Sequence, residues 1–298
     1  MSQYLESART HRLALGTVQF GLPYGIANTA GQVSLAEAER MVSLAADNSI
    51  DTIDTAIGYG ESEQVLGRIG MQGFKVVSKI PPVPPGVTNV RGWVRDEVAR
   101  SLDTLRIDRL HGLLLHRSAD LLGPYGDVLA EALCELKAEG AVVKTGVSIY
   151  APDDLETLSR KLELDLIQAP FNLADRRLHR SGWLQRLRSQ GTEIHVRSVF
   201  LQGLLLMPRE AMPPKFARWA PLFDRWHDWQ RCHEASAVAA CLAFPLSFPA
   251  IDRVVVGAND SAQLQEILRA TAQRVETALP DLACDDEDLI NPARWPAF

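Results

Sequence analysis

Four residues whose side chains can donate, accept or polarise a proton follow three consecutive apolar runs of the chain. They are Asp54 and Tyr59 in the segment DTAIGYG, Lys79 at the end of KVVSK, and His116 at the end of LLLH. A free phenol has a pKa of about 10, so it is a poor acid or base near neutral pH unless a neighbouring cation favours its ionised form. Lys79 is suited to supply that cation, and Asp54 is suited to hold Lys79. Together the four residues can interconvert a carbonyl and an alcohol, with Tyr59 as the proton donor.

Each of these residues also fits a structural role when it is considered alone. Asp54 and Lys79 fit a buried ion pair, and Tyr59 fits a capping aromatic in a turn. A lone histidine at the end of a strand, such as His116, is most often a hydrogen-bonded core residue. The catalytic interpretation depends on the four occurring together at adjacent strand ends. The seven histidines contain no H-x-H or H-E-x-x-H pair, so we expect no metal site.

These residues belong to an alternation of β-rich and helical segments that runs through the chain. We expect strands at residues 13–16, 50–54, 75–79, 110–116, 142–148, 164–168, 193–198 and 253–256, with helices between them. Ser34 begins the helix at 34–46 and Glu37 follows three residues later, which predicts a capping box. Eight such units favour an α/β fold, a closed (β/α)8 TIM barrel, over an open doubly wound sheet. The open sheet would require a G-x-G-x-x-G turn after the first strand, and GTVQFG lacks it.

A barrel of this kind gathers the carboxyl ends of its strands at one rim, where active sites lie. All four candidate residues follow strand ends, so we expect them to meet at that rim. The chain is expected to be a single domain over residues 1–298, with the barrel at about 12–270 and a loop and tail at 271–298. Residues 202–215 and those after 278 are expected to be long loops, which often cover an active site.

Composition limits the classes of function. The net charge of −6 argues against nucleic acid as a partner, because proteins that bind it usually carry a basic face. The chain contains no apolar run long enough to span a membrane, and the segment MSQYLESARTHR lacks the apolar core of a signal peptide. No two of the four cysteines have C-x-x-C spacing. We therefore expect a cytoplasmic enzyme whose partner is a small molecule.

The order and separation of DTAIGYG, VVSK and LLLH resemble those of the aldo-keto reductase family. The resemblance extends over residues 12–270 through LALGTVQFG, GVS at 146–148, Gln168 with Asn172, RSVFLQGLL and VVGANDSAQL. RSVFLQGLL also resembles a bacterial subgroup linked to surface-polysaccharide or sugar metabolism. The resemblance implies an NAD(P)H-dependent oxidoreductase that reduces an aldehyde or ketone. In that reaction hydride comes from the nicotinamide and the proton from Tyr59, with Lys79 and Asp54 tuning the phenol and His116 orienting the carbonyl.

The resemblance assigns further residues to the cofactor. These are Gly16 and Thr17 beside the nicotinamide ribose, Ser148 and Gln168 at the carboxamide, Ser198, Leu201 and Gly203 along the pyrophosphate, and Gly257, Ala258, Asn259 and Gln263 at the adenosine end.

Two positions depart from the family pattern. Ile149 stands where many members have asparagine. The turn after the eighth strand offers Asn259 and Asp260 in place of the arginine or lysine that often meets a 2′-phosphate. Arg269, later in the following helix, is a second candidate for that phosphate. We expect NADP(H) to be slightly favoured and NAD(H) to be usable.

Four residues are expected near the small-molecule carbonyl substrate, namely Phe20, Arg117, Asn172 and Arg197. Arg197 fits either a clamp for a substrate carboxylate or phosphate or an internal ion pair with a neighbouring strand. The polar groups in this set favour a sugar or sugar derivative as the substrate. Two other functions stay open: a Schiff-base lyase or aldolase with Lys79 as nucleophile, and a non-catalytic redox sensor that binds the cofactor.

Overall fold

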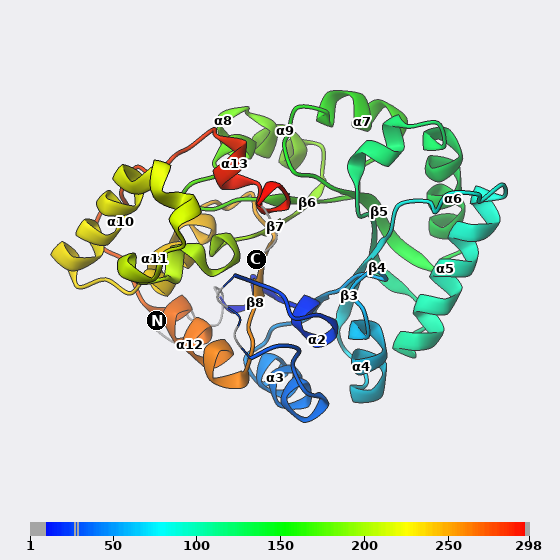
Figure 1. Cartoon of the computed structure of the whole chain (residues 1–298). Coiled ribbons are helices and arrows are strands. Elements are labelled where there is room, and N and C mark those ends of the chain that lie inside the picture. Colours follow the sequence, from blue (N-terminus) through cyan, green and yellow to red (C-terminus); the bar gives the residue numbers. More distant parts are fainter. Residues whose placement is uncertain (1–9, 27, 29, 296–298) are drawn as a thin grey trace.

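The computed structural model describes residues 10–26, 28 and 30–295, and within them parallel strands close into a barrel (Figure 1). The strands follow one another around the barrel in sequence order, and β1 pairs with both β2 and β8. They are β1 (Leu13–Gly16), β2 (Thr52–Asp54), β3 (Lys75–Ile80), β4 (Leu110–Leu115), β5 (Val142–Ser148), β6 (Leu166–Pro170), β7 (Glu193–Arg197) and β8 (Arg253–Gly257). The expected TIM barrel is confirmed, and β6 begins later than the sequence pattern indicates.

Helices form a ring outside the barrel (Figure 1). They are α2 (Val18–Gly21), α3 (Leu35–Asp47), α4 (Ser62–Ile69), α5 (Val90–Leu105), α6 (Gly126–Ala138), α7 (Leu155–Lys161), α8 (Arg177–Arg180), α9 (Trp183–Ser189), α10 (Ala220–His233), α11 (Ala237–Leu246), α12 (Ser261–Ala272) and α13 (Glu287–Ile290). Short 3-10 helices are η1 (Ser118–Leu122), η2 (Leu201–Leu206), η3 (Arg209–Ala211), η4 (Pro214–Trp219) and η5 (Pro292–Arg294). The segments expected to be long loops therefore contain short helices.

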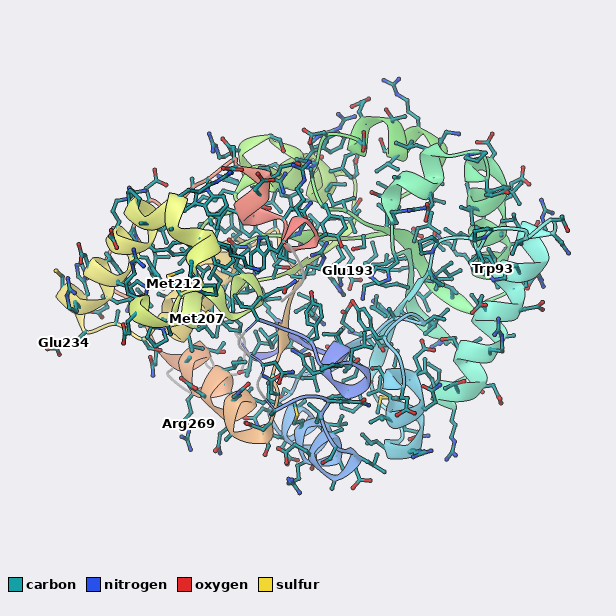
Figure 2. All side chains as sticks on the ribbon, in the orientation of Figure 1. Trp93, Glu193, Met207, Met212, Glu234 and Arg269 are labelled. Carbon is teal, nitrogen blue, oxygen red and sulfur yellow. The ribbon has the colours of Figure 1, made fainter. Side chains whose placement is uncertain are left out.

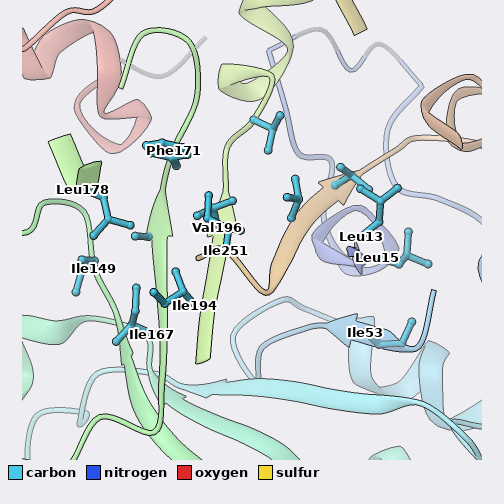
Figure 3. Close-up of a cluster of buried hydrophobic side chains, with 14 of the residues drawn as sticks. Leu13, Leu15, Ile53, Ile149, Ile167, Phe171, Leu178, Ile194, Val196 and Ile251 are labelled. Carbon is cyan, nitrogen blue, oxygen red and sulfur yellow. The ribbon is translucent and has the colours of Figure 1, made fainter. Parts of the chain in front are cut away.

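The core has two layers, because successive side chains of a strand point to opposite faces of the sheet. Leu15, Ile53 and Ile194 belong to the large cluster between the barrel and its helices, part of which Figure 3 shows. Val77, Leu114 and Leu166 form a separate, fully buried cluster. They share the strand face of Asp54, Lys79 and Gln168, so they fill the barrel interior beneath the rim.

A charged network lies inside the barrel at the amino end of β7. Glu193, near the barrel centre in Figure 2, accepts a hydrogen bond of 2.5 Å from Lys144 Nζ. It also lies 2.7 Å from His195 Nε2 and 3.1 Å from His111 Nε2. These partners together hold the pKa of Glu193 far below its ordinary value, in spite of burial. Polar groups at this end of a barrel serve stability rather than chemistry.

Helix α3 begins only partly as the sequence predicts. Ser34 accepts a hydrogen bond from Glu37 N at 3.3 Å, so the expected N-cap is confirmed. The carboxylate of Glu37 instead accepts a hydrogen bond of 2.5 Å from Ser261 N, at the start of α12. The reciprocal half of the capping box was therefore wrong, because a helix from the far end of the chain competes for the same carboxylate.

The entry to β1 is tied to the exit from the helix before β8. Arg12 donates hydrogen bonds of 2.7–2.8 Å to the backbone oxygens of Leu246, Phe248 and Ile251. These contacts hold the start of the first strand against the segment that leads into the last strand. Among the described residues, no helix is both long and apolar enough to cross a membrane.

Candidate active site

A buried ion pair joins the ends of β2 and β3. Lys79 Nζ lies 2.8 and 2.9 Å from the two carboxylate oxygens of Asp54 and 2.8 Å from the backbone oxygen of Thr55. An ammonium has three N–H donors, and these contacts use all of them. Burial lowers the pKa of Lys79, and the Asp54 carboxylate opposes that shift. Lys79 is fully buried, so its charge is available to neighbouring groups without being open to solvent.

Tyr59 lies in the turn after β2, with its ring beside the ion pair. Lys79 Nζ is 5.1 Å from the centroid of the phenol ring. Burial and the charge of Asp54 raise the pKa of Tyr59 above its ordinary value, whereas the Arg197 guanidinium opposes the shift. With its pKa raised, Tyr59 carries its proton at neutral pH. The expectation that Lys79 favours the ionised phenol stays a prediction.

His116 follows β4 and faces Tyr59. Their ring centroids are 5.5 Å apart with an interplanar angle of 78°. Burial lowers the pKa of His116 to about 4, and the Lys79 and Arg197 cations add to the effect. The imidazole is therefore neutral near pH 7, with one ring nitrogen as donor and the other as acceptor. The structure thus brings together the four residues that the sequence singled out.

Two glycines allow the Tyr59 turn to approach α2 closely. A Cβ atom at Gly21 would lie 1.7 Å from the backbone oxygen of Tyr59. Gly60 has a φ of +55°, and a Cβ there would lie 2.4 Å from the backbone oxygen of Gly21. Sequence reasoning missed this contact. Its only signal was a glycine on each side of the contact, in FG and in YG.

Strand β6 carries an amide that reaches across the barrel. Gln168 Nε2 donates a hydrogen bond of 2.6 Å to Asp54 Oδ1. Gln168 Oε1 is buried and has no partner among the described residues. Ser148 is the neighbour of Gln168 in the register of these strands. A buried acceptor without a donor is costly, so this oxygen is suited to an N–H group of a bound molecule.

The Thr17 hydroxyl makes its hydrogen bonds within the protein. Its hydroxyl donates to the backbone oxygen of Asp54 at 3.0 Å and accepts from Ser62 Oγ at 2.9 Å. Gly16 ends β1, where it pairs with Asp54 on one side and Gly257 on the other. Both residues therefore lie at the rim, and Thr17 braces the Asp54 backbone.

The segment after β7 has an unusual backbone. Ser198, Leu201, Gln202 and Gly203 have φ values of 61°, 48°, 54° and 93°. Residues other than glycine rarely adopt positive φ, and such strain concentrates at functional sites. Consecutive N–H groups in turns of this kind bind anions. The geometry supports the assignment of Ser198, Leu201 and Gly203 to a pyrophosphate, which stays a prediction.

The end of β8 leads into a helix start that is rich in carboxylates. Asp260 caps α12 by accepting from Gln263 N at 2.7 Å, and Gln263 Oε1 accepts from Asn259 N at 2.9 Å. Asn259 Oδ1 is buried without a partner among the described residues. The hydrogen bond from Ser261 lowers the pKa of Glu37 to about 2, so Glu37 is ionised there.

Two further residues near β8 have clear positions. Ala258 is buried, and Gly257 leaves space that the Gln19 amide fills, since a Cβ would lie 2.8 Å from Gln19 Nε2. Arg269 lies in the last turn of α12 at the edge of the molecule (Figure 2). It is about 12 Å along the helix from Ser261 at 1.5 Å per residue. The expectation that Arg269 reaches a phosphate at the start of α12 finds no support.

The four residues expected near the substrate lie in different environments. Phe20 is fully buried in the core between the barrel and its helices. Arg117 is exposed and paired with Asp120, three residues later. Asn172 is fully buried and its amide serves the backbone, because Nδ2 donates to the oxygen of Ser198 and Oδ1 accepts from two N–H groups. These three expectations find no support in the structure.

Arg197 is a part-buried cation at the rim without a carboxylate partner among the described residues. Its guanidinium donates to the backbone oxygen of Ile149 at 3.0 Å and to Ser198 Oγ at 3.2 Å. It also lies 4.7 Å from the centroid of the Tyr150 ring. Sequence reasoning missed Tyr150, whose signal was its position two residues after the end of β5.

Comparison with known proteins places the chain in a family. The Aldo/keto reductase family model matches residues 12–278. The chain is 25% identical to an NADH-specific methylglyoxal reductase of Escherichia coli, over 74% of this chain and 78% of that protein. It is also 25% identical to a D-threo-aldose 1-dehydrogenase of a Pseudomonas species, over 92% of this chain and 96% of that protein.

Solved structures agree on the fold. The glycerol dehydrogenase of Gluconobacter oxydans aligns with a TM-score of 0.70 at 22% identity, covering 90% of this chain and 88% of that one. An aldo-keto reductase from Bacillus halodurans aligns with a TM-score of 0.69 at 20% identity, covering 89% and 88%. The family model spans all eight strands of the barrel that carries the four residues, and the chain therefore belongs to the Aldo/keto reductase family.

Proposed function

We propose that Tyr59 gives its phenol proton to the oxygen of an aldehyde or ketone while hydride reaches the carbonyl carbon, so that an alcohol forms. The observation that carries this proposal is the position of Tyr59 between a neutral imidazole and a buried cation. Because the pKa of Tyr59 is raised, the phenol keeps its proton until negative charge develops on the substrate oxygen.

The neighbouring residues have separate tasks. His116 is neutral, so its ring N–H can donate to the carbonyl oxygen without bringing a second charge. After proton transfer the phenolate of Tyr59 is stabilised by the Lys79 ammonium, which Asp54 holds in place. Solvent then returns the proton to Tyr59.

The family uses nicotinamide cofactors, and this chain has groups that fit one. When bound, the reduced nicotinamide supplies the hydride. Gln168 Oε1, buried without a partner among the described residues, would accept a hydrogen bond from the carboxamide. Ser148 would stand beside it, and the left-handed turn at 198–203 would receive the pyrophosphate.

The choice between NADP(H) and NAD(H) depends on the start of α12. The family resemblance slightly favours NADP(H), but Glu37 adds an ionised carboxylate at Ser261 N that the sequence did not reveal. Asp260 adds a second carboxylate at this helix terminus, which would otherwise attract a phosphate, and Arg40 pairs with the other carboxylate oxygen of Glu37. We therefore propose that NAD(H) is the better cofactor. One relative is named as NADH-specific, which supports this choice.

The two alternative functions have less support. A Schiff base would require Lys79 to present a neutral amine to a substrate carbon, yet its ammonium is fully buried and makes three hydrogen bonds. A non-catalytic sensor would not need the complete set of four residues. Membership of a family whose relatives are named as reductases and dehydrogenases also favours an enzyme.

The test is the oxidation of NADH and NADPH by the purified protein with methylglyoxal and other small aldehydes. We expect turnover with at least one aldehyde. Tyr59→Phe should lower kcat by roughly 100-fold or more, with the dissociation constant of the cofactor little changed. Near-normal turnover in Tyr59→Phe would show that another group supplies the proton. Reduction by borohydride in the presence of an aldehyde, followed by mass spectrometry of Lys79, tests the Schiff-base alternative separately.

A further inference from the structure

Arg197 ends β7, two residues beyond His195, so it lies closer to the rim than the charged network inside the barrel. Glu193, His195 and Arg197 occupy alternate positions of β7, so their side chains leave the same face of the strand. Glu193 and His195 contact each other at 2.7 Å within the barrel interior. The same alternation directs Arg197 into the top layer, at the rim where Tyr59 and His116 lie.

The guanidinium of Arg197 has no carboxylate partner. Its two hydrogen bonds go to the oxygen of Ile149 and the hydroxyl of Ser198, both uncharged. No carboxylate oxygen of the described residues lies within 4.0 Å of it. Two other partly buried arginines have carboxylate partners, since Arg177 pairs with Asp175 at 2.8 Å and Arg253 with Asp51 at 3.0 Å. The internal ion pair that the sequence left open for Arg197 is thus absent from this part of the chain.

The Arg197 guanidinium is therefore fixed in position and still has N–H groups free to donate to a ligand. A guanidinium has five N–H groups in a planar fork, and the two hydrogen bonds of Arg197 use two of them. The Tyr150 ring packs against it at 4.7 Å and further restricts its position. A half-buried charge without an opposite charge is costly to maintain, which is expected where a ligand provides the missing anion.

The other charges at the rim cancel. Asp54 is taken by Lys79 and Gln168, and His116 is neutral. Arg197 therefore gives the site one net positive charge, which acts on Tyr59, His116 and Lys79 and on the phenol of Tyr24. The expected hydrogen-bonding set for a sugar is missing, because Arg117 and Asn172 are engaged elsewhere.

We propose that this chain reduces carbonyl compounds that carry an anionic group, a carboxylate or a phosphate, and that the Arg197 guanidinium binds that group. The inference rests on the proposed function, since it concerns the substrate that Tyr59 protonates. A planar fork with adjacent free donors matches the paired oxygens of either anion. Arg197 would therefore select the substrate and hold its carbonyl at a fixed distance from Tyr59.

The experiment compares substrates that differ in charge. Values of kcat/KM are measured for 4-carboxybenzaldehyde against benzaldehyde, and for glyceraldehyde 3-phosphate against glyceraldehyde. We expect the wild type to prefer one anionic member by roughly 10- to 100-fold, as for a hydrogen bond between charged groups. The pair with the larger ratio distinguishes a carboxylate from a phosphate. Arg197→Gln should remove most of that ratio, and Arg197→Lys should restore part of it.

Arg117→Gln is the matched control, because it removes an exposed cation next to His116 that is already paired with Asp120. It should leave the ratio unchanged. Equal kcat/KM values within both pairs in the wild type would overturn the inference. A rise in the dissociation constant of NADH in Arg197→Gln, with equal losses on charged and neutral aldehydes, would also overturn it and assign Arg197 to the cofactor.

The proposed function and the inference fail in different ways. Absence of turnover with every aldehyde contradicts the proposed function. The inference is then still tested by calorimetry with the alcohol products, 4-carboxybenzyl alcohol against benzyl alcohol and glycerol 3-phosphate against glycerol, in the presence of NAD⁺. Tighter binding of an anionic alcohol to the wild type but not to Arg197→Gln supports it, and equal binding within both pairs refutes it.

Discussion

The Tyr59 ring meets the His116 ring nearly at right angles, with centroids 5.5 Å apart. The pKa values of the two side chains are shifted in opposite directions. Burial raises the pKa of Tyr59 above its ordinary value of 10.0 and lowers that of His116 to about 4. Both groups are therefore uncharged over a wide range of pH. In the proposed reaction, a phenol that keeps its proton and an imidazole that stays neutral are the two donors to the carbonyl oxygen.

The first prediction is a broad, flat pH profile. We expect kcat/KM for aldehyde reduction to vary little between about pH 5 and 10, because neither Tyr59 nor His116 titrates there. Folding stability should respond as well. The unfolded chain binds a proton at His116 below about pH 6.5 and the folded chain only near pH 4, so His116 lowers stability as the pH falls through that window. A kinetic pKa near 6.5 that disappears in His116→Asn would contradict this prediction.

The second prediction concerns the buried ion pair. Asp54→Asn leaves the Lys79 ammonium buried without its carboxylate, which should cost about 3–5 kcal/mol in the free energy of unfolding. The double variant Asp54→Asn with Lys79→Met removes both charges and should recover part of that loss. Denaturant unfolding followed by circular dichroism measures both. If the double variant is no more stable than Asp54→Asn alone, the cost does not come from an uncompensated charge.

The third prediction tests how Tyr59 is positioned. Gly21→Ala places a methyl group where the Tyr59 backbone oxygen lies, so the turn after β2 must move. We expect kcat to fall by roughly 100-fold, since small displacements of a catalytic group are costly, while the KM for the cofactor changes less. Gly58→Ala is the control in the same turn, because a Cβ there meets no atom within 4 Å. Equal losses in the two variants would show that the turn is sensitive for another reason.

The fourth prediction concerns the cofactor. Glu37→Gln removes the negative charge beside Ser261 N and should shift the ratio of dissociation constants toward NADPH by roughly three- to tenfold. Fluorescence titration with NADH and NADPH gives the ratio directly. Glu39→Gln removes a carboxylate from the exposed side of the same helix and should leave it unchanged. A tight preference of the wild type for NADPH, unaffected by Glu37→Gln, would place the 2′-phosphate elsewhere.

The sequence predicts the barrel and its four central residues well, because both depend on local patterns. A strand end is marked by the change from an apolar run to polar residues, and Asp54, Lys79 and His116 each stand at such a change. The strand β5 has the expected bounds. Parallel pairing then brings these ends to one rim without further information.

Contacts between distant segments escape the same reasoning. Glu37 and Ser261 lie 224 residues apart, and nothing near Glu37 in the sequence announces that partner. Arg117 and Arg197 were both expected near the substrate, but their contacts in the structure differ. Arg117 has Asp120 three residues away, which could have been read as a local pair. The surroundings of Arg197 depend on distant segments, such as Ile149, 48 residues earlier, and include no carboxylate of the described residues within 4.0 Å.

The closure between β1 and β8 has a consequence for how the chain folds as it is made. Arg12 contacts backbone oxygens 234 to 239 residues later, and β1 gains its second neighbour only from β8. During synthesis, Asp54, Tyr59, Lys79 and His116 leave the ribosome long before this seam can form. Until then the growing sheet has two unpaired edges, and exposed edges recruit other chains. A product that terminates before β8 is therefore expected to aggregate, although it contains every proposed acid–base residue.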